Sequence, residues 1–278
     1  MRLSPHVPLL LGILSLGTAT YTASHQANET ILEKQLDVFE CRCGASEFLT
    51  LPHANITTSE EALKCSEYKL IDARGTAEPQ GISTMFHIMI SNILANTTGG
   101  VSLPVQYPAG PDQNTTNGEN FVSKVIHEGL HRCPGQKYAL FGYSQGATLM
   151  LKVLNRLDRD AIKMVKSVIL VGNPYRLPGK MSNVNEKGLK DHSQSVGMFT
   201  AAASRQNSSA SNIIPQLSDQ LDKSGKVLDY CLAGDGVCSY NPACPCQLPA
   251  GHLSYGLTET VQSSAFEHVV SRLGGNAN

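Results

Sequence analysis

One serine between two glycines is the feature of this sequence that most directly indicates chemistry. Ser144 stands in Gly142-Tyr143-Ser144-Gln145-Gly146, after the apolar run 138–141 and before an apolar helical pattern over 147–154. A strand, a Gly-x-Ser-x-Gly turn and a helix make the nucleophile elbow, which exposes the serine hydroxyl at a helix N-terminus. Only glycine leaves room for the close approach of the two backbones. The alternative is a glycine-rich connection without a catalytic role.

A serine hydroxyl needs a neighbouring base held by an acid, and α/β-hydrolases supply them in the chain order Ser, Asp or Glu, His. The histidines that follow Ser144 are His192, His252 and His268. His268 falls within a helical pattern over 258–273, and we expect it at the surface. His192 lies in a polar stretch away from any predicted strand end. His252 lies in a loop before the last helix, so we predict that it is the base.

Two aspartates are candidates for the acid. Asp235 lies in Cys231-Leu232-Ala233-Gly234-Asp235-Gly236-Val237-Cys238, and a disulfide between these cysteines would put it at the tip of a tight loop. Asp229 is the alternative, but it alternates within a predicted strand, 227–230, and we expect it to face solvent. We therefore favour Asp235.

The elements that must position these residues alternate along the chain. Apolar strand patterns precede the polar loop 74–81, the loop 109–120, the elbow and the segment after Tyr230, and helical patterns lie between them. This alternation predicts an α/β fold, a three-layer sandwich with a central parallel sheet and helices on both faces. Functional residues then collect at the carboxyl ends of the strands. The predicted strands are 68–73, 105–107, 138–141, 165–171 and 227–230, and the predicted helices are 85–94, 121–130, 147–154 and 258–273.

Several motifs together carry a resemblance to a known family. The chain is similar to the cutinase family of secreted serine esterases, which includes acetylxylan esterases. The resemblance covers about residues 65–273. Its motifs are Cys65, Ala73-Arg74-Gly75-Thr76-Ala77-Glu78, Cys133-Pro134, Gly142-Tyr143-Ser144-Gln145-Gly146-Ala147, Cys231-x-x-Gly234-Asp235-x-Val237-Cys238 and His252-Leu253-x-Tyr255.

The resemblance implies a role for each matching residue. Ser144 would be the nucleophile, His252 the base and Asp235 the orienting acid. The backbone N–H groups of Thr76 and Gln145 would form the oxyanion hole, with help from the Thr76 hydroxyl where cutinases typically have serine. For the matching cysteines we expect the disulfides Cys65–Cys133 and Cys231–Cys238.

Four further cysteines lie outside the family pattern: Cys41, Cys43, Cys244 and Cys246. We expect them to pair among themselves and to hold the N-terminal extension beside the site, and their connectivity stays open. Zinc binding by these four is the competing interpretation.

The N-terminus and the sequons indicate the secretory pathway. Residues 1–19 resemble a signal peptide, 20–64 an N-terminal extension and 65–278 the catalytic domain. A short membrane anchor is the alternative for the first segment. Eight cysteines fit an oxidising compartment. We therefore predict a secreted, extracellular protein, with candidate N-glycosylation at Asn28, Asn55, Asn96, Asn114 and Asn207.

Composition narrows the function further. A net charge of −1 without a basic block gives no indication of nucleic-acid binding, and no stretch after the first segment is apolar enough to span a membrane. We expect a monomer without metal or cofactor that hydrolyses carboxylic esters, either cutin-like polyester or short-to-medium acyl esters. Deacetylation of polysaccharide and a catalytically inactive binding protein are the alternatives. Neither the natural substrate nor its acyl length follows from the sequence.

Overall fold

The computed structural model describes residues 59–205, 214–242 and 250–274. Within these ranges six strands form one all-parallel sheet in the order β2-β1-β3-β4-β6-β5. The sheet is built from β1 (Tyr68–Ala73), β2 (Gly100–Pro104), β3 (Lys137–Tyr143), β4 (Val165–Val171), β5 (Asn183–Val184) and β6 (Val227–Tyr230). The α/β fold with a central parallel sheet is confirmed.

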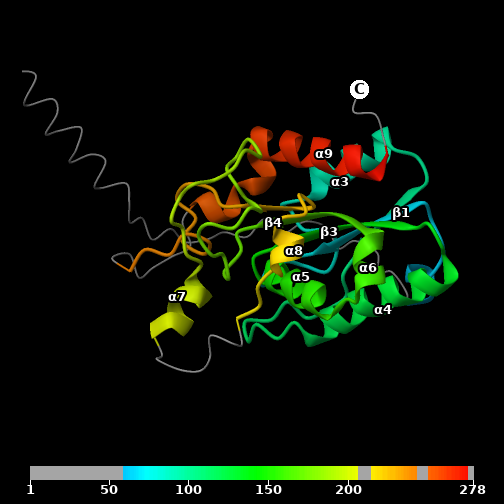
Figure 1. Ribbon diagram of the computed structural model, residues 1–278, viewed down its shortest axis with the longest axis horizontal. Helices are drawn as coiled ribbons and strands as arrows, with labels where there is room; N and C mark the ends of the chain where they lie inside the picture. The colour runs from blue at the N-terminus through cyan, green and yellow to red at the C-terminus, as the bar shows by residue number, and fades with distance from the viewer. Residues whose placement is uncertain (1–58, 206–213, 243–249, 275–278) are drawn as a thin grey trace, which may run out of the picture. The chain divides into compact units, whose positions relative to one another are not determined.

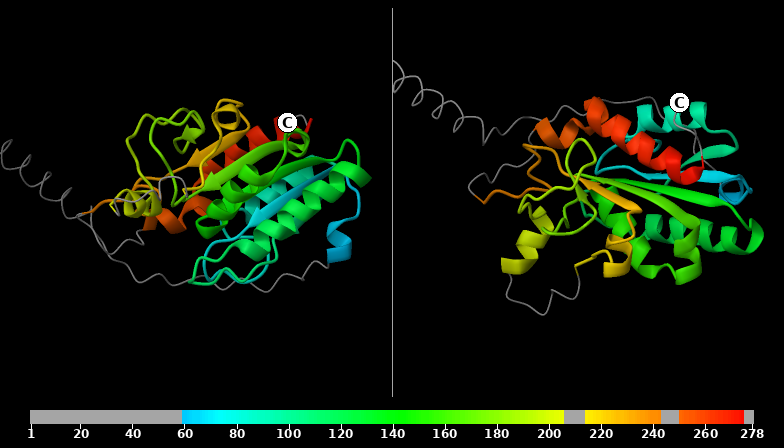
Figure 2. Two further views of the ribbon diagram at one scale, coloured as in Figure 1. Left: turned by 60° about the horizontal axis from the view of Figure 1, so that its bottom comes forward. Right: turned by 45° about the horizontal axis from the view of Figure 1, so that its top comes forward.

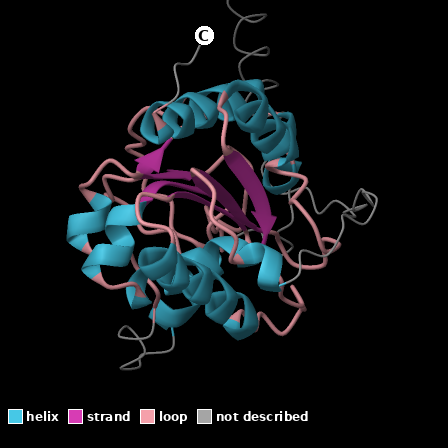
Figure 3. Ribbon diagram, turned by 90° about the vertical axis from the view of Figure 1, so that its right-hand side faces the viewer, coloured by secondary structure: helices cyan, strands magenta, loops and turns pink. Residues whose placement is uncertain are grey.

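Helices cover both faces of this sheet (Figure 1). One layer holds α3 and α9, and the opposite layer holds α4, α5 and α6; the right-hand view of Figure 2 shows red α9 above the strands and the green helices below them. In Figure 3 the strands lie between the two layers. The helices are α2 (Ser59–Ala62), α3 (His87–Asn96), α4 (Thr116–Arg132), α5 (Gln145–Arg156), α6 (Arg159–Met164), α7 (Met198–Arg205), α8 (Asp219–Asp222) and α9 (Glu259–Leu273), with the short 3₁₀ helices η2 (Ala250–Leu253) and η3 (Tyr255–Leu257).

The hydrophobic core has two parts because side chains alternate between the two faces of each strand. Leu70 and Phe141 belong to the cluster that packs on α3 and α9. Their neighbours Ile71 and Leu140 belong to the cluster that packs on α4 and α5. The central strands are buried on both faces, which explains why their sequences read as continuous apolar runs.

The second strand is not where the apolar pattern predicted it. We expected a strand at 105–107, but β2 ends at Pro104. Val105 still donates its N–H to Asp72 O (2.8 Å), and the chain then leaves the sheet. Tyr107 is buried in the core cluster, its carbonyl accepts from Arg74 Nη2 (2.6 Å) and its ring lies under the guanidinium. The apolar residues 105 and 107 thus belong to a packed loop. The strand β2 lies at the edge of the sheet, and part of its residues are exposed.

Candidate active site

The turn around Ser144 has the geometry of a nucleophile elbow. Ser144 has φ 53° and ψ −115°, a conformation that few non-glycine residues adopt, and α5 begins at the next residue. A Cβ on Gly146 would lie 1.9 Å from Ala73 O, and one on Gly142 would lie 2.6 Å from Gly146 O. The two flanking glycines are therefore required by the contact between β1, β3 and α5.

The structure brings Ser144, His252 and Asp235 together from three separate segments. His252, in η2, places Nε2 3.0 Å from Ser144 Oγ and Nδ1 3.0 Å from Asp235 Oδ2. His252 and Asp235 are only 3% and 1% exposed, so water does not compete for these contacts. Ser144 follows the carboxyl end of β3, Asp235 lies in the loop after β6, and His252 lies in η2 before α9.

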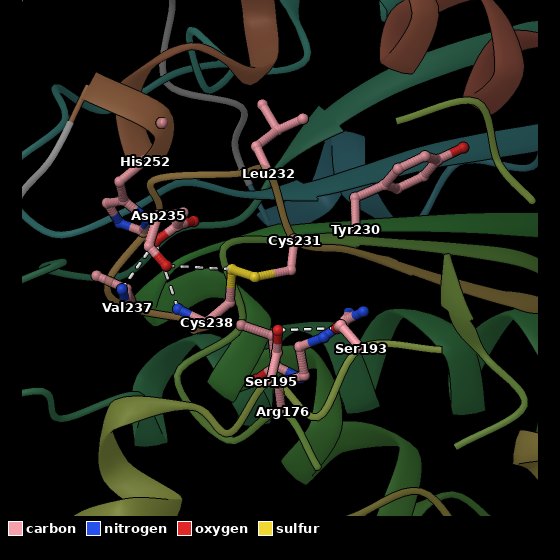
Figure 4. Close-up of a disulfide and its surroundings, with 12 residues drawn as sticks. Arg176, Ser193, Ser195, Tyr230, Cys231, Leu232, Asp235, Val237, Cys238 and His252 are labelled. Carbon is pink, nitrogen blue, oxygen red and sulfur yellow. Dashed lines mark hydrogen bonds and ion pairs between the residues drawn. A yellow bond between two sulfur atoms is a disulfide. The ribbon is translucent and has the colours of Figure 1, made fainter. Parts of the chain in front are cut away.

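Asp235 is held by several hydrogen-bond donors (Figure 4). Its Oδ1 accepts from the backbone N–H groups of Val237 (2.8 Å) and Cys238 (3.3 Å), and its Oδ2 accepts from the hydroxyl of Tyr255 (2.6 Å). Burial by itself would raise the pKa of Asp235, but its electrostatic interaction with His252 and these hydrogen bonds outweigh it and hold the pKa below its ordinary value. Asp235 is therefore ionised at neutral pH.

The disulfide Cys231–Cys238 closes the loop that carries Asp235, as Figure 4 shows. Cys238 contributes its N–H to the carboxylate and its Sγ lies 3.4 Å from the Tyr255 hydroxyl. The second disulfide, Cys65–Cys133, joins the chain before β1 to the end of α4. Both disulfides expected from the resemblance are present.

Tyr143 of the elbow and Gly172 after β4 both lie against His252, and sequence reasoning identified neither role. Tyr143 donates its hydroxyl to His252 O (3.0 Å), and the two rings lie 5.0 Å apart. Gly172 ends β4 at φ 62°, and a Cβ there would lie 2.6 Å from His252 Cε1. The glycine after an apolar strand was the one available signal, because it marks a close approach.

The side chains of the two residues proposed for the oxyanion hole are in contact. Thr76 Oγ1 is 3.2 Å from Gln145 Oε1, and within the described part of the chain no acceptor takes the backbone N–H of either residue. Gln113, which the sequence did not single out, donates Nε2 to Thr76 Oγ1 (2.9 Å). The Thr76 hydroxyl is therefore held by two side-chain amides.

Glu78 fixes the backbone of the same loop. Its Oε2 accepts from Gly75 N–H (2.6 Å), and its Oε1 accepts from the N–H and hydroxyl of Thr84 (2.9 and 2.6 Å). Arg74 adds a hydrogen bond from Nε to Glu78 O (2.8 Å). The motif Arg74–Glu78 thus forms a hydrogen-bonded turn beside the elbow, where a Cβ on Gly75 would lie 3.4 Å from Ser144 Cβ.

The prediction that Asp229 faces solvent is wrong. Asp229 is 4% exposed and lies 3.2 Å from Arg176 Nη1, while its Oδ2 accepts from Asn173 Nδ2 (2.8 Å). Arg176 also binds Asp191 (2.6 Å), so one buried guanidinium joins β6 to the loop before α7. Asp229 has this structural partner and no contact with His252 within the described residues.

The remaining predicted residues divide into exposed, half-buried and undescribed positions. Asn96 and Asn114 are exposed. His268, expected at the surface, is half-buried with Nε2 3.1 Å from Lys226 O, and burial lowers its pKa to about 4. The signal peptide, most of the N-terminal extension, Asn28, Asn55, Asn207 and the cysteines Cys41, Cys43, Cys244 and Cys246 lie outside the described residues.

The described ranges contain neither a metal-ligand cluster nor a membrane span. There, no group of three or more His, Cys, Asp and Glu side chains is placed to hold a metal ion. No described helix combines the length and apolar character needed to cross a bilayer.

Comparisons with known proteins agree with this geometry. The family model described as Cutinase matches residues 64–273. A cutinase of Hypocrea jecorina is 31% identical over 122 residues, which are 40% of this chain and 47% of the relative. The chain thus spans about half the length of this curated relative.

Two solved structures extend the likeness over most of the described chain. A cutinase-like protein from Cryptococcus sp. is 34% identical with a TM-score of 0.65, and the match covers 76% of this chain and 96% of that one. The catalytic core domain of an acetyl xylan esterase from Trichoderma reesei gives a TM-score of 0.57 at 21% identity, covering 75% and 100% of the two chains. At this lower identity the likeness concerns the fold alone.

Proposed function

Because the chain belongs to the cutinase family, we propose that it is a secreted serine esterase that hydrolyses carboxylic esters through an acyl-enzyme. The observation that carries this proposal is the arrangement around His252, whose ring nitrogens lie 3.0 Å from Ser144 Oγ and 3.0 Å from Asp235 Oδ2. A nucleophile, a base and an orienting acid in this order are the minimal machinery for acyl transfer.

The protonation states follow from the hydrogen bonds. Asp235 is ionised and can only accept, so the ring proton of neutral His252 lies on Nδ1. This tautomer leaves the Nε2 lone pair facing the Ser144 hydroxyl. Ser144 Oγ attacks the ester carbonyl carbon while its proton passes to Nε2, and the carbonyl oxygen becomes an oxyanion.

The two N–H groups beside the nucleophile would stabilise that oxyanion. The donors are the backbone N–H groups of Thr76 and Gln145, and Gln145 is the first residue of α5, where the helix dipole also favours negative charge. As the intermediate collapses, His252 gives its Nε2 proton to the leaving alkoxide and the alcohol departs. Water then attacks the acyl-Ser144 ester, His252 takes one water proton and returns it to Oγ, and the carboxylic acid is released.

Labelling by a fluorophosphonate tests this assignment directly, because such probes react with an activated serine. We expect one adduct, at Ser144, and its loss in Ser144→Ala together with nearly all ester hydrolysis. Ser193→Ala is the matched control, since Ser193 is exposed and bonds only within its own loop in the described structure. If Ser144→Ala hydrolyses esters like the wild type, the proposal fails. If the wild type neither labels nor hydrolyses, the esterase proposal fails and the catalytically inactive alternative is favoured.

The substrate class that we propose is a short-to-medium acyl ester or a cutin-like polyester, with polysaccharide deacetylation as the alternative. The cutinase-like neighbour at 34% identity supports the first reading. Rates on p-nitrophenyl esters of increasing acyl length, on a polyester film and on acetylated xylan would separate the two. Release of acetate from xylan at a higher rate than any longer acyl group would favour the alternative.

A further inference from the structure

Asn114 lies in a loop, and the residues before and after it in the chain are both held by hydrogen bonds. Gln113 donates Nε2 to Thr76 Oγ1 (2.9 Å), beside the proposed oxyanion donors. On the other side, Thr115 is fully buried and its hydroxyl binds Glu119 Oε1 (2.6 Å). Asn114 therefore stands between a residue held on the site and a residue held in the core.

The loop has further attachments that keep it in place. Ala77 donates its N–H to Ala109 O (2.9 Å), and Lys152 of α5 donates to Thr115 Oγ1 (2.9 Å). Glu119, 1% exposed, also pairs with Arg156 (2.8 Å). Gln113 has φ 58°, a conformation that persists in a non-glycine residue only when its surroundings hold it. Any group attached at Asn114 would start from a fixed point.

Asn114 itself is exposed, and its side-chain amide nitrogen is not engaged within the described chain. The residue is exposed, and its Oδ1 accepts from Thr116 N–H (3.1 Å), which leaves the amide nitrogen without a partner in the described structure. Asn114-Thr115-Thr116 is an N-glycosylation sequon. The nitrogen that a glycan would modify is therefore not engaged in a hydrogen bond among the described residues.

The other described sequon lies at the opposite end of the sheet, where the strands begin. Asn96 ends α3, shortly before β2 begins at Gly100. In a parallel sheet all strands begin at one end of the sheet, and the proposed active site lies at the opposite end, where the strands finish. Asn114 follows the carboxyl end of β2 and precedes α4, so it lies at the same end of the sheet as Ser144. Asn96 is therefore a natural control for a glycan that lies away from the site.

We propose that Asn114 carries an N-linked glycan that restricts access of polymeric, surface-bound esters to the proposed active site while admitting small soluble esters. A glycan is bulky and hydrated, and from this fixed root it must occupy space beside the Thr76 loop. A flat polymer surface must approach the whole end of the sheet that carries Ser144 to place an ester on its hydroxyl, whereas a small ester needs access only to Ser144. This proposal rests on the proposed function and on passage through the secretory pathway.

The test uses the full chain expressed in a host that adds N-glycans. Mass spectrometry of the peptide containing Asn114 should show a glycan in the wild type and in Thr116→Ser, and none in Asn114→Gln or Thr116→Ala. Hydrolysis of a polyester film, divided by hydrolysis of p-nitrophenyl butyrate, should rise severalfold in the two variants that lack the sequon. Asn96→Gln should leave this ratio unchanged.

Enzymatic removal of glycans from the folded wild type should raise the same ratio, whereas the same treatment of Asn114→Gln, which still carries the other sequons, should leave its ratio unchanged. An unmodified Asn114, or a ratio that stays at the wild-type value after its glycan is gone, would overturn the proposal. Absence of p-nitrophenyl butyrate hydrolysis in every variant would instead count against the esterase assignment, while occupancy at Asn114 is still read from the mass.

Discussion

Replacing Tyr255 by phenylalanine should separate the stability of the site from its turnover. The Tyr255 hydroxyl is fully buried, donates to Asp235 Oδ2 (2.6 Å) and accepts from Leu232 N–H (3.1 Å). Burial and the charge of Asp235 raise the pKa of Tyr255 well above its ordinary value, so the hydroxyl keeps its proton and remains a donor. Phenylalanine keeps the ring and removes both hydrogen bonds.

The expected loss of stability is about 2 kcal/mol at neutral pH. A hydrogen bond to a charged group contributes roughly 1.5–3 kcal/mol, and Leu232 is half-buried, so water can replace the acceptor for its N–H. For a domain of this size that loss corresponds to a fall in Tm of roughly 4–8 °C. Turnover should fall by less than about tenfold, because His252 and the N–H groups of Val237 and Cys238 still hold the carboxylate, whereas loss of the acid itself can cost about 10⁴.

The sign of the pH dependence follows from Asp235. Its pKa is lowered in the folded protein, so its contribution to stability is present above the ordinary carboxyl pKa and is lost as the pH falls through the lower folded value. The difference between wild type and Tyr255→Phe should therefore be full at pH 7 and shrink below about pH 4.

The assay is urea unfolding and ester hydrolysis on the same preparations at several pH values. Tyr240→Phe is the matched control, since its hydroxyl accepts from Arg205 (3.1 Å) near the surface and the substitution should change neither quantity. An unchanged free energy of unfolding in Tyr255→Phe would refute the buried hydrogen bond. A thousandfold loss of turnover would refute the view that the remaining three donors position the acid.

Three further outcomes follow from the same contacts. Thr76→Val should reduce turnover by less than the roughly hundredfold that is typical for loss of an oxyanion donor, because the hydroxyl lies against Gln145 Oε1 and the backbone donors remain; a larger fall in kcat would mean that the hydroxyl binds the oxyanion. His268, whose pKa is lowered to about 4 by burial, should make the wild type lose stability as the pH falls from about 6.5 toward 4, and His268→Gln should flatten that slope in urea titrations. Removing the Cys65–Cys133 disulfide should lower the free energy of unfolding by up to about 4 kcal/mol by the chain-entropy model, with little change in turnover per folded molecule. Calorimetry and active-site titration measure the two quantities. A loss of turnover in proportion to the loss of stability would mean that this distant disulfide also shapes the site.

Short-range patterns predicted much of the fold because strands and the elbow are determined over a few residues. The strands at 68–73, 165–171 and 227–230 were identified correctly, since buried parallel strands read as continuous apolar runs. The second strand was misplaced, because Val105 and Tyr107 are buried in the core cluster from a loop that follows β2 and not from a strand. Local sequence reports that a residue is buried, but not which partner buries it.

The sequence by itself determined the elbow and the candidates for its partners. The Gly-x-Ser-x-Gly pattern around Ser144 is read within five residues, and chain order with the family resemblance singled out Asp235 and His252. Only the tertiary structure decided what supports them. Tyr143 reaches His252 across 109 residues, and Arg176 meets Asp229 across 53. Such contacts depend on how the strands are ordered in the sheet, and no periodicity in the chain encodes them.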